Sequence, residues 1–170
     1  MVLVAVSAGL VIASSAFAAI SAGDRISPDG LGRVTVGMTI DEASAALGAP
    51  LDVNRDAGDG TCFGARPLGS GRGISFLGTG DRIARAHVFG RSRIRTPEGA
   101  GVGTTERGVR SLYPGRVRAS RHQYVRGGRY LTVTGYESGR LLIFETNARR
   151  RVTALRAGAL PEVGYIEGCS

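Results

Sequence analysis

Two stretches of the chain place apolar side chains at the spacing of a short amphipathic helix. In residues 40–47 one apolar stripe recurs at helical spacing, Thr39 and Glu42 form the pattern of a capping box, and Gly48 follows. The same order returns 66 residues later, where Val-Gly-Thr-Thr replaces Val-Gly-Met-Thr ahead of residues 106–113. The pattern predicts two helices at corresponding places in two successive units.

After each expected helix the polarity changes to the alternation typical of strands. Turns rich in Gly, Asn and Asp separate the last two alternating stretches in each half, which predicts hairpins. The hairpins are offset by 68 to 69 residues, close to the offset of the helices. The expected strands lie at residues 61–63, 73–77, 82–89, 130–134, 141–145 and 151–156.

These elements predict an α+β fold built by tandem duplication of an αβββ unit. A unit of about 65 residues has little core of its own, so two units would share one antiparallel sheet with the helices packed on one face. We expect a single domain over residues 33–169, made of repeats at about 33–95 and 96–169. Residues 19–32 carry Ser, Gly, Pro and Asp without periodicity, which predicts an N-terminal leader.

The beginning of the chain has the pattern of a secretory signal peptide. No charge occurs before Asp24, and an apolar run precedes the small-x-small pair Ala16 and Ala18. We expect residues 1–18 to be removed by cleavage after Ala18. The run is shorter than the roughly 20 apolar residues that span a bilayer, so we expect no stable membrane insertion after cleavage. The first basic residue is Arg25, which departs from the usual basic start and leaves the true start codon open.

The chain has two cysteines, Cys62 and Cys169. In a secreted protein an even number of cysteines favours pairing, so we expect a disulfide between them, with a nucleophilic thiol or a metal ligand as alternatives. The expected location is the extracellular space or the cell envelope.

The charge balance is strongly basic, and every basic side chain except the histidines is arginine. The chain has 22 Arg and no Lys against 14 acidic residues, a net charge of +8. Two interpretations are open: a solvated surface that reflects a coding preference for Arg, or a binding patch. The arginines are spread along the chain, so we expect no nucleic-acid partner.

A family resemblance rests on residues 30–48, Gly-Leu-Gly-Arg-Val-Thr-Val-Gly-Met-Thr-Ile-Asp-Glu-Ala-Ser-Ala-Ala-Leu-Gly. This stretch resembles the opening motif of the beta-lactamase inhibitor protein-like superfamily, which includes the small lipoprotein of the outer-membrane assembly machinery. The overall layout also resembles secreted proteins of high-GC Gram-positive bacteria. The resemblance implies tandem helix-plus-meander units and a sheet whose open face binds another protein. The second copy departs from the motif at Thr104 and at Gly108, which stands where the motif has Glu.

Residue patterns for catalysis or metal binding are weak. His87 and His122 lack a second ligand at i+3 or i+4, and G-x-S-x-G does not occur. Asp52, Asp56 and Asp59 follow the first helix and could bind calcium, but they lack the EF-hand spacing, and a solvated turn is the alternative. We therefore expect no enzyme activity, no metal and no cofactor.

Polar residues on one side of the expected hairpins form the candidate site. Arg and Tyr are favoured at protein interfaces, so a rigid sheet face would bind another extracellular or envelope protein. The alternatives are an inhibitor of an extracellular hydrolase, which would insert loop 91–103 or loop 115–128, and a binder of an anionic cell-wall polymer. The candidate binding residues are Arg82, Arg85, His87, Tyr130, Arg151 and Arg156.

Overall fold

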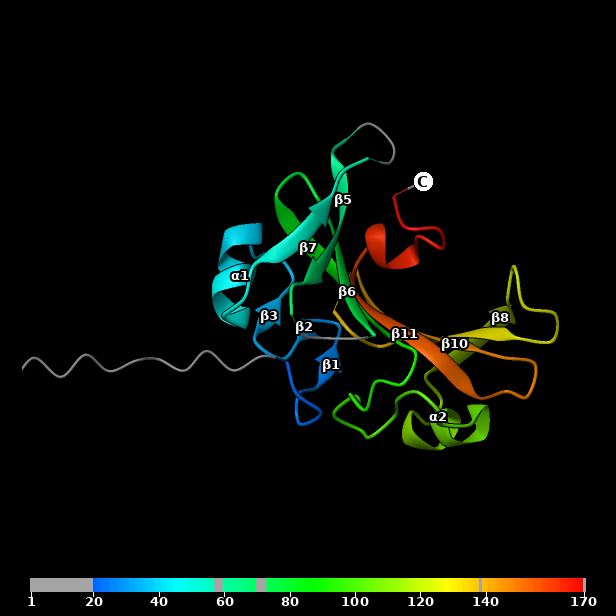
Figure 1. Ribbon diagram of the computed structural model, residues 1–170. Helices are drawn as coiled ribbons and strands as arrows, with labels where there is room; N and C mark the ends of the chain where they lie inside the picture. Colours follow the sequence, from blue (N-terminus) through cyan, green and yellow to red (C-terminus); the bar gives the residue numbers. More distant parts are fainter. Residues whose placement is uncertain (1–19, 57–59, 70–72, 138, 170) are drawn as a thin grey trace, which may run out of the picture.

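The computed structural model describes residues 20–56, 60–69, 73–137 and 139–169. Its elements follow the chain from blue to red in Figure 1. The helices are α1 (Ile40–Leu47) and α2 (Glu106–Leu112), and η1 (Glu162–Gly164) is a short 3-10 turn. The strands are β1 (Ile26–Ser27), β2 (Gly30–Leu31), β3 (Val34–Thr35), β4 (Leu51–Asn54), β5 (Cys62–Pro67), β6 (Ile74–Thr79), β7 (Arg82–Phe89), β8 (Val117–Arg121), β9 (Arg129–Val133), β10 (Arg140–Thr146) and β11 (Val152–Ala159).

One antiparallel sheet of eight strands dominates the molecule. Its order is β4-β5-β6-β7-β11-β10-β9-β8, so the two halves of the chain meet where β7 pairs with β11. Within each half, consecutive strands are neighbours, and in Figure 1 the sheet twists from β5 at the top to β8 at the right. Each half therefore contributes a helix followed by four strands rather than three.

The expected α+β class with helices packed on one sheet face is wrong, because the protein is mostly β. The helices begin where the polarity pattern placed them, but α1 has eight residues and α2 has seven, too few to cover an eight-stranded sheet. The pattern also missed both edge strands. Leu-Asp-Val-Asn in β4 and Val-Arg-Ala-Ser-Arg in β8 are short and polar, as edge strands often are.

The two halves repeat the same backbone hydrogen bonds around the start of each helix. Gly37 and Gly103 have positive φ angles of 98° and 88°, which glycine adopts without strain. The amide of each donates to the strand that ends its half, to the carbonyl of Ile83 at 2.7 Å and of Val152 at 2.8 Å. The amides of these two residues donate back to Met38 and Thr104 at 2.8 and 2.9 Å. Both helices are thus attached to the large sheet in the same way.

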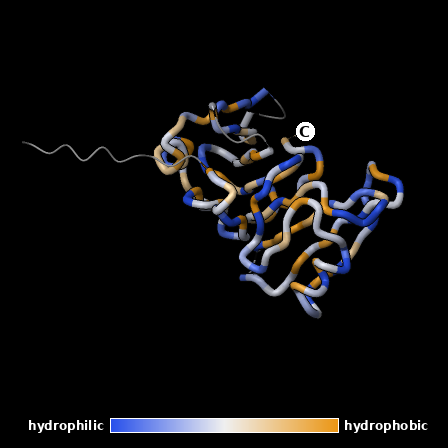
Figure 2. Tube along the Cα trace, turned by 60° about the horizontal axis from the view of Figure 1, so that its bottom comes forward, coloured by the Kyte–Doolittle hydropathy of each residue, from blue (hydrophilic) through white to orange (hydrophobic). Residues whose placement is uncertain are grey.

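The main core lies on one side of the large sheet. Alternate positions of the strands supply buried residues such as Phe63, Phe76 and Phe144, and Figure 2 shows this alternation of apolar and polar residues along the trace. Ala43 of α1 and Val109 of α2 join the same core, and both are completely buried.

The segment expected to be a leader contributes to this core. β1, β2 and β3 form a three-stranded sheet, and Ile26, Leu31 and Val34 are completely buried. The expected signal peptide and its cleavage site after Ala18 lie outside the described residues. Within the described ranges, no helix is long and apolar enough to cross a membrane.

Candidate functional site

The C-terminal segment, residues 160–169, crosses the other face of the large sheet. In Figure 1 it lies in the angle between β5 and β8, on the side away from β1 and α2. A disulfide between Cys62 and Cys169 attaches its end to the beginning of β5, with 5.5 Å between the Cα atoms. The predicted pairing of the two cysteines is confirmed, and it fixes the segment against the sheet.

Two arginines on the central strands hold this segment through its backbone. Arg85 on β7 donates from Nη1 to the carbonyls of Glu162, at 3.1 Å, and Tyr165, at 2.7 Å. Arg156 on β11 donates from Nε to the carbonyl of Val163 at 2.8 Å. Both side chains are buried, with 7% and 4% of their surface exposed. These guanidinium groups therefore satisfy the carbonyls of Val163 and Tyr165, and the Glu162 carbonyl accepts from the amide of Tyr165 as well as from Arg85.

A charged network continues from Arg156 toward β9. The Arg156 guanidinium pairs with Glu145, whose second oxygen lies 3.5 Å from Nε2 of His122. Arg156 also lies over the ring of Tyr130, and His122 stacks on the same ring with 4.4 Å between centroids. Tyr130, Ile143 and the fully buried Val163 form a small apolar cluster beside this network. Polar and apolar contacts together fasten η1 to the sheet.

His87 lies between the two arginines on the same face. It is paired in register with Arg156 on β11, and its Nε2 is buried without a hydrogen-bond partner. Burial lowers the pKa of His87 to about 4, and the charges of Arg85 and Arg156 act in the same direction. Burial, followed by the charge of Arg156, lowers the pKa of Arg85 to about 10. His87 is therefore neutral at pH 7, while Arg85 keeps its charge.

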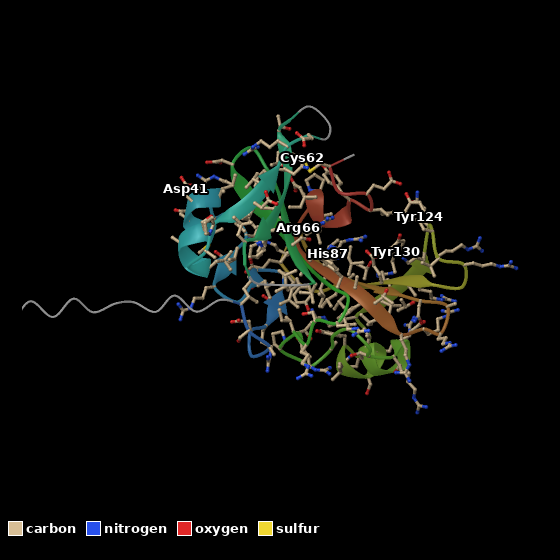
Figure 3. The ribbon with its side chains drawn as sticks, viewed as in Figure 1. Asp41, Cys62, Arg66, His87, Tyr124 and Tyr130 are labelled. Atoms are coloured by element: carbon tan, nitrogen blue, oxygen red, sulfur yellow. A yellow bond between two sulfur atoms is a disulfide. The ribbon has the colours of Figure 1, made fainter. Side chains whose placement is uncertain are left out.

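A hollow of about 440 Å³ opens beside Arg85, between β4–β7 and the end of the C-terminal segment. The pleat places Arg66, Ser75 and Arg85 on this face, because Gly64 is opposite Leu77 and Leu77 is opposite Arg85. Figure 3 shows Arg66 and His87 pointing into the same region between β5 and the C-terminal segment. The lining residues are Asp52, Asn54, Gly64, Ala65, Arg66, Ser75, Phe76, Leu77, Arg85, Gly168 and Cys169.

Two details of the lining bear on what the hollow can bind. The Nε of Arg85 is buried and has no hydrogen-bond partner among the described residues, although Nη1 of the same side chain is fully used. Gly64 has no atom within 4 Å of the position that a Cβ would take, so the floor is open at this point. Arg85 therefore lines the hollow while one of its donors is still unused, which suits an acceptor on a ligand.

The structure brings together four of the six predicted binding residues. Arg85, His87, Tyr130 and Arg156 lie on the face that the C-terminal segment covers. Arg82 and Arg151 are exposed at the beginning of the hairpin strands, where they donate to the carbonyls of Gly37 at 2.7 Å and Gly103 at 3.1 Å. A role of these six residues in binding a partner stays a prediction.

The remaining candidate regions are residues 91–103 and 115–128 and the aspartates after the first helix. Loop 91–103 is folded back, since Ile94 and Ala100 are buried. Residues 115–128 were expected to form a loop, but they contain the strand β8, after which Tyr124 is 58% exposed. Asp52 lies on β4, and Asp59 lies outside the described residues. In the described part of the chain, no three potential metal ligands form a group.

Comparison with known proteins gives no relative: no family model, curated protein or solved structure matches the chain at a significant level. The resemblance to the beta-lactamase inhibitor protein-like superfamily therefore stays a prediction. The function is therefore inferred from the geometry of the site itself.

Sequence reasoning missed Gly64, Arg66 and Ser75, and it missed the cover over the arginine face. One signal could have found them. If Cys62 pairs with Cys169, the last residues must pass close to the beginning of β5, and Val163 is an apolar residue that can pack on the sheet there. The alternation of the strands would then place Arg66 and Arg85 beneath that segment.

Proposed function

We propose that the protein is a non-catalytic binding domain of the extracellular space, which takes an acidic side chain or terminal carboxylate of a partner protein into the hollow beside Arg85. The observation that carries the proposal is that Arg85 lines the hollow while its buried Nε has no hydrogen-bond partner among the described residues. A carboxylate there would accept a charge-assisted hydrogen bond, which is stronger than one between neutral groups.

The remaining lining supports an acidic ligand of limited size. Arg66 adds a second positive charge and Ser75 and Asn54 add neutral polar groups, while Asp52 sets a limit by repelling a carboxylate placed near β4. A volume of about 440 Å³ accommodates one or two side chains. The ligand would therefore be the tip of a partner's loop or its chain end, with the surrounding surface making the remaining contacts.

A passive role is supported by the groups present. The lining contains one carboxylate, Asp52, and neither a histidine nor a free thiol, since both cysteines are paired. General acid–base or nucleophilic chemistry needs such groups within reach of one another. The disulfide and the finding on membrane helices are compatible with an extracellular protein.

The two helices are attached to the large sheet in the same way, which supports an origin of the fold by internal duplication. Each half orders its elements as a helix and four strands, and the same amide and carbonyl pairs connect helix start and final strand. Only the first half carries the hollow, because its lining comes from β4–β7 and the C-terminal segment.

Replacement of Gly64 by Leu tests the proposal. Gly64 lies on a strand with open space at its Cβ position, so Gly64→Leu fills the hollow and leaves the fold intact. Ser120→Leu is the matched control, because Ser120 is an exposed position on the same face of the sheet at the far edge, on β8. The probes are short peptides that end in Asp or Glu, with amidated and Asn- or Gln-ending peptides for comparison.

We expect the wild type and Ser120→Leu to bind the acidic peptides in preference to the neutral ones, and Gly64→Leu to lose at least tenfold in affinity, which is about 1.4 kcal/mol. Equal binding by Gly64→Leu, or no preference for the acidic peptides, would contradict the proposal. Retention of the wild-type melting temperature by both variants shows that folding is not the cause.

A further inference from the structure

A second feature of the molecule is independent of the hollow: positive charge is concentrated between residues 106 and 151. Residues 106–151 contain eleven arginines and three acidic residues, whereas the corresponding residues 40–82 contain four arginines and six acidic residues. A coding preference for Arg over Lys explains why the basic residue is always Arg. It does not explain why these two corresponding segments differ by ten charges.

Several of these arginines gather at the end of the sheet formed by the second half. Arg121 on β8 and Arg129 on β9 are directly opposite each other in the register. Like charges in this arrangement repel, so the fold gains nothing from the pair. Gly127 in the β8–β9 loop lies against Ala148 in the β10–β11 turn, which brings the neighbouring residues Arg126 and Arg149 to the same end.

The helix α2 completes this surface. Glu106 accepts hydrogen bonds from Arg110 at 2.9 Å and from Arg150 at 3.0 Å, and the charge of Arg129 also acts on it. These arginines outweigh the effect of burial and lower the pKa of Glu106. The single carboxylate of Glu106 thus interacts with three guanidinium groups. In Figure 1 the β8–β9 loop, the β10–β11 turn and α2 lie at the same end of the molecule. We call this surface the arginine end; it consists of Arg110, Arg121, Arg126, Arg129, Arg149 and Arg150.

The side chains of Arg121, Arg126 and Arg149 are exposed, and no hydrogen bond or ion pair to the described residues engages them. Glu145, the other carboxylate on the neighbouring strands, is on the opposite face of the sheet, where it pairs with Arg156. The arginine end therefore keeps a net positive charge that no internal contact uses.

We propose that the arginine end binds an extracellular polymer of repeating phosphodiester groups and thereby keeps the domain at the cell envelope. Guanidinium groups bind phosphate oxygens in pairs, and a row of such groups matches charges that repeat along a chain. The arginines extend over a loop, a strand end and a turn rather than around one point, which suits a polymer better than a single anion. The disulfide, which is compatible with an extracellular protein, favours an envelope polymer over a nucleic acid.

The test uses fluorescently labelled poly(glycerol phosphate) as the probe and a DNA duplex with the same number of phosphates as the comparison. The double variant Arg121→Gln/Arg126→Gln removes two charges from the arginine end. The matched control, Arg91→Gln/Arg93→Gln, removes two exposed charges from the first half and changes the net charge equally. Dissociation constants are measured between about 50 and 200 mM salt, the range over which phosphate contacts lose strength steeply.

We expect the wild type and the control to bind poly(glycerol phosphate) within about twofold of each other, and Arg121→Gln/Arg126→Gln to bind about tenfold more weakly with a shallower salt dependence. Equal weakening in both double variants would overturn the proposal, because binding would then depend on net charge alone. DNA binding that is as tight as polymer binding would overturn the envelope polymer in favour of a nucleic acid. The Arg121→Gln/Arg126→Gln variant should bind the acidic peptides as tightly as the wild type does. This control shows that the loss of polymer binding does not come from a change in the hollow.

Discussion

At the scale of single residues, arginine has two different uses in this protein. Arg85 and Arg156 are buried and hold carbonyls of the chain's own C-terminal segment, whereas Arg121 and Arg129 face each other at the sheet edge. Buried arginines need partners because an unpaired charge in the interior is costly. The same residue type therefore fixes the fold on one face and leaves charge available at the other end.

His87 makes the stability of the protein depend on pH. Its pKa in the folded protein is about 4, below the ordinary value of 6.5, so the unfolded chain binds a proton more readily than the folded one. The contribution of His87 is complete above pH 6.5 and is lost as the pH falls toward 4, on the order of 2–3 kcal/mol over that window. The carboxylates of Glu145 and Glu162 also face this cluster.

Replacement of His87 by Gln isolates the contribution of His87 to the pH dependence of stability. Urea unfolding between pH 7 and about pH 4.5 should show a steeper loss of stability for the wild type than for His87→Gln, because Gln carries no titrating proton. Parallel pH profiles for the two proteins would exclude His87 as the cause.

Relief of the repulsion between Arg121 and Arg129 should stabilise the protein. In Arg121→Glu a negative charge faces Arg129 across the strands, so we expect the free energy of unfolding to rise by about 0.5 kcal/mol at low salt. Arg118→Glu makes the same charge change opposite Thr132 and serves as the control. A stability gain of equal size in both variants would assign the effect to net charge rather than to the pair.

At the scale of elements, the helix starts were predictable because a few local residues determine them. Thr39 accepts from the amide of Glu42 at 3.1 Å, and the Glu42 carboxylate accepts from the amide of Thr39 at 2.8 Å, so the capping box is confirmed. The second helix keeps the cap at Thr105 but lacks the returning Glu, since Gly108 stands there.

The capping box provides a local test of helix stability. Glu42→Gln preserves an acceptor for the amide of Thr39 and should be nearly neutral, whereas Glu42→Ala should lower the free energy of unfolding by about 0.5–1 kcal/mol. Denaturant unfolding of the two variants measures the difference. If both substitutions cost the same, the negative charge near the helix N-terminus matters more than the hydrogen bond.

The edge strands and the cover of the sheet could not be read from polarity. β4 and β8 lie at the sheet edges and have only four and five residues. Their apolar and polar residues do alternate, as in Leu-Asp-Val-Asn of β4, but alternation over so few residues is weak evidence for a strand. The position of the C-terminal segment depends on contacts over long separations, such as Arg85 with Tyr165, 80 residues apart. Alternation correctly grouped Arg85, His87 and Arg156, but it could not tell a solvated face from one covered by the chain's own end.

At the scale of the whole molecule, the disulfide holds the C-terminal segment against the strands that line the hollow. It joins positions 107 residues apart and connects β5 of the first half to the end of the chain. Removal of the bridge in Cys62→Ser/Cys169→Ser should lower the free energy of unfolding by about 4 kcal/mol, because the unfolded chain regains its freedom. Urea unfolding measures this change, and a loss below about 1 kcal/mol would show that Arg85, Arg156 and Val163 hold the segment without the bridge.

The central claim is that an acidic group enters the hollow and meets the buried Nε of Arg85. The most direct measurement is the NMR signal of the Arg85 Nε–H group during titration with a peptide that ends in Asp. The account predicts that this signal shifts with the peptide in the wild type and in Ser120→Leu, and stays in place in Gly64→Leu. An Arg85 signal that does not move in the wild type while the peptide binds would contradict the account, because the carboxylate would then bind elsewhere.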